Sequence, residues 1–156
     1  MLTTARYLSL SGNLGVVIDM PESAAIRIED ICTPALIIDL PSMEWNISTM
    51  ATIASQRGIS LRPYVKTHKS TVLAHRQLEA GATGIGCATI DEAEVMAAAG
   101  IRDILIGNQI VGAVNIARLI ELTRHVDIMV AVDDYGNVDR NPDSVLLHFG
   151  SGIWGA

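Results

Sequence analysis

Aromatic residues are scarce in this sequence: its 156 residues include one Phe, two Trp and three Tyr. Hydrophobic residues still make up 49% of the chain, and Ala, Ile, Leu and Val supply most of them. That choice of apolar residues is typical of helices that pack on a parallel sheet. The length predicts one domain that can bury a sizeable core.

Cysteine and positive charge are also in short supply. Cys32 and Cys87 are far apart and match no zinc or redox spacing, which favours a reducing, cytoplasmic location. Eleven Lys and Arg stand against 17 Asp and Glu, for a net charge of -6, and no basic stripe occurs, so we expect no nucleic-acid partner. The N-terminal 22 residues have a broken apolar stretch and no small-residue cleavage site, so we expect neither a signal peptide nor a membrane span.

The first part of the chain shows little regular pattern. Residues 1–30 have no clean periodicity, and we interpret them as a leader of uncertain order. Residues 35–40 follow a Thr-Pro pair and predict a short strand. Pro41 can then open a helix that continues to about Arg57, where Gly58 ends it.

From Ser60 onward, predicted strands alternate with predicted helices, and the strands start about 20–24 residues apart. This rhythm predicts a βαβ series with a parallel sheet, either doubly wound or part of a (β/α)8 barrel. In both folds the active groups gather at the carboxyl ends of the strands. The predicted strands are 60–65, 83–88, 103–107 and 127–133, and the predicted helices are 71–80, 90–100 and about 112–123.

Individual residues weaken or support particular elements of this series. Pro63 would weaken the strand at 60–65 as a central strand. Thr89 and Glu92 have the spacing of a capping box for the third helix. After Asp134 the chain is rich in Gly, Asn, Asp and Pro, and no amphipathic helix follows where the rhythm requires one. We therefore expect an irregular tail at 139–156, open sheet edges and poor solubility.

The segment RPYVKTHKS, residues 62–70, carries the first candidates for chemistry. Lys66 leaves the strand at its carboxyl end, and Tyr64 alternates with it, so both side chains can point to one face. If that face is desolvated, Lys66 can supply the neutral amine that Schiff-base formation requires. Alternatively, Lys66 and Lys69 are ordinary solvated loop lysines. His68 is either a proton shuttle or phosphate partner, or a solvated loop residue.

Other strand ends offer weaker candidates. Their polar residues could contact a ligand, but capping the next helix or pinning the turn is their more ordinary use. The glycines of GATGIGCAT precede and fill a strand, so we reject a dinucleotide fingerprint. No pair of histidines has metal-ligand spacing on one helix. The residues concerned are Asn108 and Gln109 after the third predicted strand, and Asp133 and Asp134 after the fourth.

Four segments of the chain carry a resemblance to a known family: TPALIIDL, LRPYVKTHKS, GATGIGCATIDEAEVMAAAGIRDILIGNQIVG and IMVAVDD. Together they are similar to the N-terminal half of the D-threonine aldolase and D-serine dehydratase family, pyridoxal-phosphate enzymes with an alanine-racemase-like barrel. The resemblance runs from about Thr33 to Val138 and keeps the order and spacing of the segments. Its most specific part is the lysine segment, where the family carries Arg-Pro-His-x-Lys-Thr-His-Lys.

The resemblance implies an α/β fold with a partial (β/α)8 TIM barrel of the alanine racemase N-terminal type. About four of the eight barrel strands would lie in residues 31–138, and the strand at 35–40 would belong to a small β-domain. Lys66 would bind pyridoxal 5'-phosphate covalently, with Tyr64 and His68 as further cofactor-binding residues. Tyr64 departs from the family, which usually has histidine there.

The implied activity is that of a lyase acting on 3-hydroxy D-amino acids, either as an aldolase or as a dehydratase. The family's divalent metal is held by residues of its C-terminal half, so we expect no metal ligands here and a truncated form of the enzyme. The alternative is a catalytically inactive half-barrel remnant or interaction fragment. A D-amino acid is the expected small-molecule partner, and a homodimer is the expected assembly.

Overall fold

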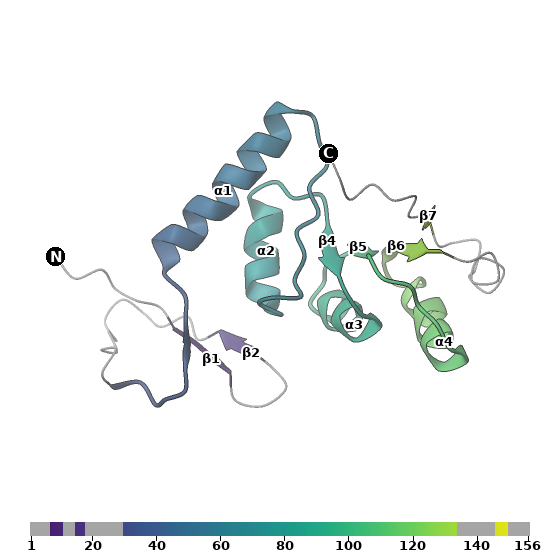
Figure 1. Ribbon diagram of the computed structural model, residues 1–156, viewed down its shortest axis with the longest axis horizontal. Helices are drawn as coiled ribbons and strands as arrows, with labels where there is room; N and C mark the ends of the chain where they lie inside the picture. The colour runs from purple at the N-terminus through teal and green to yellow at the C-terminus, as the bar shows by residue number, and fades with distance from the viewer. Residues whose placement is uncertain (1–6, 11–14, 18–29, 134–145, 150–156) are drawn as a thin grey trace. The chain divides into compact units, whose positions relative to one another are not determined.

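The computed structural model describes residues 7–10, 15–17, 30–133 and 146–149 (Figure 1). The chain divides into two compact units between Gly58 and Ile59. Each unit has its own sheet, and the two sheets differ in type: the first is antiparallel and the second is parallel. The second unit contains every candidate site residue, so the fold of that unit determines the site.

The first unit contains a three-stranded antiparallel sheet in the order β2-β1-β3. Its strands are β1 (Tyr7–Leu10), β2 (Gly15–Val17) and β3 (Leu36–Ile37). Two of these strands lie within residues 1–30, where no regular structure was predicted. β1 pairs with β3, almost thirty residues along the chain, and local periodicity cannot reveal such a partner.

Helix α1 (Leu40–Gln56) begins and ends as the sequence predicts. Asp39 is its N-cap, and its Oδ1 accepts a hydrogen bond from the Ser42 N–H at 3.0 Å. Pro41 lies in the first turn, and Gly58, with a φ of 65°, follows the C-cap. Because Asp39 is already part of this cap, the predicted strand at 35–40 is shortened to the two residues of β3. None of the described helices is long and apolar enough to cross a membrane.

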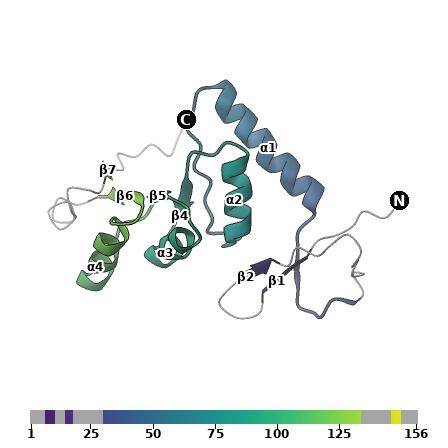
Figure 2. The same cartoon turned by 180° about the vertical axis from the view of Figure 1, so that it is seen from behind.

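The second unit contains a parallel sheet in the order β4-β5-β6-β7, which Figures 1 and 2 show from opposite sides. Helices alternate with the strands from α2 to β6, so the βαβ series predicted from Ser60 onward is confirmed over that part of the chain. The helix boundaries differ from the predictions by one or two residues. The elements are α2 (Thr71–Glu79), β4 (Ile85–Cys87), α3 (Ile90–Ala98), β5 (Asp103–Ile106), α4 (Ala113–Leu122), β6 (Asp127–Val132) and β7 (Leu146–Phe149).

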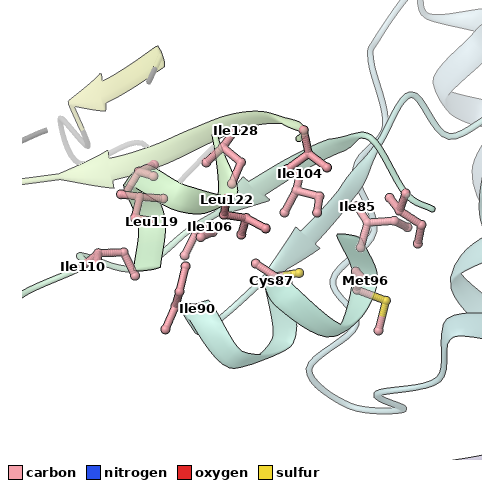
Figure 3. Packing of buried hydrophobic residues seen from close by; sticks show 14 of the residues in the cluster. Ile85, Cys87, Ile90, Met96, Ile104, Ile106, Ile110, Leu119, Leu122 and Ile128 are labelled. Carbon is pink, nitrogen blue, oxygen red and sulfur yellow. The ribbon is translucent and has the colours of Figure 1, made fainter. Parts of the chain in front are cut away.

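One face of this sheet packs against the helices and forms the core. Ile104 and Ile106 of β5 and Ile128 of β6 are almost fully buried there, together with Leu119 of α4 and Met96 of α3 (Figure 3). Alternate residues point to the opposite face. Leu105 and Met129 are only partly buried on it, although they are apolar and lie in the middle of strands. The sheet therefore has one covered face and one open face.

Two expectations about strands are corrected. The predicted strand at 60–65 is reduced to an isolated parallel bridge between Tyr64 and Gly86, because Pro63 has no N–H to donate to a ladder. The tail at 139–156 is not irregular throughout, since β7 pairs in parallel with β6, from Met129 opposite Leu146 to Val132 opposite Phe149. β6 is therefore not the open edge that we expected.

Candidate active site

The candidate site begins at the segment before α2, which runs parallel to β4. The Val65 N–H donates to the Gly86 carbonyl at 2.9 Å, and the Gly86 N–H donates to the Pro63 carbonyl at 2.8 Å. The Val65 side chain is fully buried in the core, so Tyr64 on the alternate face lies on the open side of the sheet. These bonds fix the backbone at the point where the segment turns away from the sheet.

Lys66 follows at the carboxyl end of this segment. Its Nζ lies 5.4 Å from the centre of the Tyr64 ring, which confirms that the two alternate side chains share a face. The Lys66 side chain is exposed, so the described residues do not form the desolvated face on which the Schiff-base interpretation of this segment depends. Among the described residues Lys66 forms no ion pair, and its amine is free to meet a ligand.

Lys69, the only other lysine of the chain, is held differently. Its Nζ lies 3.2 Å from Oε1 of the buried Glu92, and its backbone has a φ of 50°. The other carboxylate oxygen of Glu92 accepts a hydrogen bond from the Ala88 N–H at 2.8 Å. Lys69 therefore ties the turn to the beginning of α3, and this leaves Lys66 as the reactive candidate.

The capping box predicted at the start of α3 is present with one difference. Thr89 is the N-cap, and its Oγ1 accepts a hydrogen bond from the Glu92 N–H at 3.3 Å. The return bond from the Glu92 side chain reaches Ala88, one residue before the N-cap, instead of Thr89 itself. In this position the same carboxylate can also pair with Lys69.

His68 is half-buried in the turn, and one of its ring nitrogens is already engaged. Its Nδ1 accepts a hydrogen bond from the Ser70 N–H at 3.0 Å, so the neutral ring carries its proton on Nε2. Burial lowers the pKa of His68, and the nearby Gln77 side chain opposes part of that shift, although the Gln77 oxygen lies outside hydrogen-bond geometry. Nε2 is itself buried and has no hydrogen-bond partner among the described residues, so neither ring nitrogen of His68 is exposed to a cofactor in this arrangement.

Tyr64 lies across the ends of two neighbouring strands. A Cβ on Gly86 of β4 would lie 2.8 Å from Cδ2 of the Tyr64 ring, and a Cβ on Gly107, just after β5, would overlap the Tyr64 hydroxyl oxygen. Burial raises the pKa of the Tyr64 phenol, with a smaller contribution from Cys87. The phenol therefore stays protonated at neutral pH and can donate a hydrogen bond.

Arg62 reaches across β4 to β5 in the same way as Tyr64, but nearer the start of the strands. Its Nε and a terminal guanidinium nitrogen each donate to a different carboxylate oxygen of Asp103, both at 2.8 Å. A Cβ on Gly84 would overlap that carboxylate. Gly84 and Gly86, which match no nucleotide fingerprint, thus make room for side chains that reach from residues 62–64 to β5. We did not predict this role from the sequence, where the only signal is the two-residue spacing that the glycines share with Arg62 and Tyr64.

The weaker candidates stay at the periphery. Asn108 donates through Nδ2 to the Ala88 carbonyl at 2.8 Å and pins the turn after β5 to the end of β4. Gln109 and Asp133 are exposed, and Asp134 lies outside the described residues. Among the residues that the structure describes, no three His, Cys, Asp or Glu side chains come close enough together to hold a metal ion.

Comparison with known proteins gives a family match over most of this region. The model of the family "Alanine racemase, N-terminal domain" matches residues 38–146. The match continues past Val138, where our sequence analysis ended the resemblance. Together with the solved structures below, it confirms the predicted partial α/β barrel.

Similar proteins carry the names of D-amino-acid lyases. The chain is 37% identical to a D-threonine aldolase of Arthrobacter sp over 81% of its own length and 33% of that protein. It is 34% identical to a 3-hydroxy-D-aspartate aldolase of Paracoccus denitrificans over 77% of its length and 32% of that protein. The chain therefore spans about a third of the length of these relatives.

A solved structure agrees with these matches. The crystal structure of D-threonine aldolase from Filomicrobium marinum superposes with a TM-score of 0.73 and 38% identity. The superposition covers 77% of this chain and 35% of that protein.

Proposed function

This chain belongs to the family of alanine racemase N-terminal domains, and we propose from that membership that it carries the cofactor lysine of a pyridoxal-phosphate-dependent lyase acting on 3-hydroxy D-amino acids. One observation carries the proposal: the unpaired amine of Lys66 lies at the carboxyl end of a barrel segment, on the face that the helices leave open. Relatives named as D-threonine aldolase and 3-hydroxy-D-aspartate aldolase support the lyase class and the D-configuration of the substrate.

The described residues fit the cofactor at its reactive end. Lys66 would hold pyridoxal phosphate through Nζ, which an aldehyde can reach because the side chain is exposed and forms no ion pair among the described residues. Tyr64 would lie beside the amine as a hydrogen-bond donor. Nε2 of His68 is buried, so His68 would reach the cofactor only if its turn opened. When bound, the cofactor withdraws electrons from Cα of an attached amino acid, and the surrounding protein directs which bond breaks.

Two reactions fit this class of substrate. Cleavage of the Cα–Cβ bond of a 3-hydroxy D-amino acid yields glycine and an aldehyde. Loss of the Cα proton and the β-hydroxyl, followed by hydrolysis, yields a 2-oxo acid and ammonia. The similar proteins named above are aldolases. A D-threo-3-hydroxyaspartate dehydratase of Delftia sp. (strain HT23) is 49% identical to this chain over 73 residues, so both reactions are represented among similar proteins.

A second candidate function is an inactive half-barrel that binds cofactor or a protein partner without turnover. It is favoured by the exposure of the Lys66 side chain, which the described residues do not enclose in a site for an amino acid. Under this alternative Lys66 would still react with the cofactor, but no amino acid would be consumed.

The test uses the fact that Lys66 and Lys69 are the only two lysines of the sequence. The chain is mixed with pyridoxal phosphate, reduced with borohydride and digested, and the modified lysine is located by mass spectrometry. We expect modification of Lys66 in the wild type and in Lys69→Arg, and loss of it in Lys66→Arg. Equal modification of Lys69 would overturn the proposal.

Turnover is then measured with D-threonine and D-3-hydroxyaspartate. Glycine and an aldehyde would identify an aldolase, and a 2-oxo acid with ammonia would identify a dehydratase. Modification of Lys66 without any product would favour the inactive half-barrel.

A further inference from the structure

The space around the Tyr64 ring is created by two glycines on different strands. Gly86 lies beneath the ring in β4, and Gly107 lies at the hydroxyl end, just after β5. Neither glycine has a positive φ, so neither position needs glycine for its backbone conformation. The close approach of the Tyr64 side chain is what excludes a Cβ at these two positions.

The ring in turn limits where the Lys66 amine can go. Lys66 has a flexible four-carbon stem and no ion pair among the described residues, so its own backbone leaves the amine many positions. The Tyr64 ring lies 5.4 Å from Nζ, within the range at which an ammonium is attracted to an aromatic face. The hydrogen bonds of Val65 and Gly86 hold the backbone between the two residues.

We propose that Tyr64 is a positioning residue for the Lys66 amine, and that Gly86 and Gly107 are the small residues that let its ring reach that position. The proposal rests on the proposed function for the catalytic importance of Lys66. The contact itself belongs to the chain without cofactor and can be measured there. The face of the Tyr64 ring attracts the Lys66 amine, and a smaller side chain at the same position would not reach it.

The competing explanation is that Tyr64 merely fills the open face of the sheet. In that case Tyr64→Leu would still remove the ring-current shift of the Lys66 signal, but pyridoxal phosphate would react with Lys66 equally well in Tyr64→Leu and Tyr64→Phe, apart from any loss of stability. If Tyr64 positions the amine, only an aromatic replacement preserves the environment of Lys66. Tyr64→Phe and Tyr64→Leu are therefore a matched pair, because both remove the hydroxyl and only one keeps the ring.

The first experiment is NMR of the full chain with [ε-13C]lysine, without cofactor. The two lysines give two side-chain signals, and Lys69→Arg assigns them. We expect Tyr64→Leu to move the Lys66 signal by removing the aromatic ring current, Tyr64→Phe to retain most of the wild-type shift, and Lys69 to stay unchanged. An identical Lys66 signal in wild type and Tyr64→Leu would overturn the proposal.

Gly107→Ala gives a second measurement that leaves Tyr64 in place. Because the new methyl group would overlap the Tyr64 hydroxyl, we expect it to displace the ring and move the Lys66 signal toward that of Tyr64→Leu. The same substitution in Tyr64→Leu should add little. Equal effects of Gly107→Ala in both backgrounds would contradict the proposed coupling. Circular dichroism melts of each variant separate these local shifts from unfolding.

Borohydride trapping links the inference to function. We expect Tyr64→Leu to trap pyridoxal phosphate on Lys66 about two- to fivefold less efficiently than Tyr64→Phe, because without the ring the flexible Lys66 stem must be ordered when the amine reacts. No trapping in any variant, together with the expected NMR shifts, would overturn the proposed function and leave the positioning role intact. Equal and detectable trapping in Tyr64→Leu and Tyr64→Phe would overturn the positioning role alone, even with a shifted NMR signal, because removal of the ring current shifts that signal in either case.

Discussion

The thiol of Cys87 should be almost inert in the folded chain, and this property tests the core beside the candidate site. Cys87 lies in β4, directly after Gly86, and its side chain is fully buried. Burial raises the pKa of the Cys87 thiol from 9.0 to about 12, with a smaller contribution from Glu92. Because the thiolate is the reactive form, a shift of this size lowers the reactive fraction at pH 8 about a thousandfold.

Cys32, which is exposed, supplies the internal reference. The chain is treated with iodoacetamide at pH 8, and the alkylation of each cysteine is followed by mass spectrometry. We expect rapid alkylation of Cys32 and at least a hundredfold slower alkylation of Cys87, since transient opening sets a floor for the slower rate. In urea the two rates should converge. Similar rates under native conditions would refute the reasoning, because they would mean that the isolated chain does not form this core.

The raised pKa of Cys87 also predicts how stability depends on pH. The unfolded chain releases this thiol proton near pH 9, whereas the folded chain retains it to about pH 12. The stabilisation that comes from the protonated Cys87 thiol is therefore complete below pH 9 and is lost as the pH rises toward 12. The free energy of unfolding falls by at most about 4 kcal/mol over this range for this reason. Cys87→Ala should remove that part of the alkaline loss, as measured by urea unfolding between pH 8 and 11.

Three further substitutions, one control substitution and one assembly measurement test other parts of the second unit. Gly84→Ala should lower the free energy of unfolding by about 1–3 kcal/mol, because its Cβ would also lie 2.6 Å from the Asp103 carbonyl oxygen; an unchanged urea midpoint would contradict that close approach. Ser70→Ala removes the side-chain cap of α2 and should cost about 1 kcal/mol, whereas Thr123→Ala, at the exposed end of α4, should cost less than about 0.5 kcal/mol. Arg62→Gln should cost about 0.5–1 kcal/mol at low salt and less at high salt, since its bidentate pair is partly exposed; no dependence on salt would argue against the pair. The isolated chain should associate through the open edges of its parallel sheet. A monomer in light scattering that also melts cooperatively in calorimetry would contradict this expectation.

Much of the second unit was predictable because its determinants are local. Ser70 before α2 and Thr89 before α3 have the side chains that cap helices, and the structure uses both. Gly81 and Gly100 follow these helices with positive φ values, where glycine is favoured. The spacing of apolar segments then leaves a parallel βαβ series as the simplest fold.

The strands that were missed or misjudged depend on partners far along the chain. β1 and β2 form an antiparallel sheet with β3, and β7 gains its partner when it reaches β6. In the segment before α2, by contrast, Pro63 leaves only a single bridge to β4. Short strands carry little periodicity of their own, so their existence depends on whether a partner with free backbone groups is within reach.

The candidate site likewise has features that depend on local sequence and features that depend on contacts between distant residues. By its residue types and their order, the sequence alone determined Lys66 as the amine to examine and Tyr64 as its neighbour on one face, since that alternation is a property of extended backbone. Only the tertiary structure decided that Lys69 is bound to Glu92 and that Lys66 is free. It also decided that the Tyr64 ring rests on Gly86 and Gly107, which lie more than twenty residues away. The physical reason is that ion pairs and ring contacts depend on distances between strands, and those distances exist only once the sheet has formed.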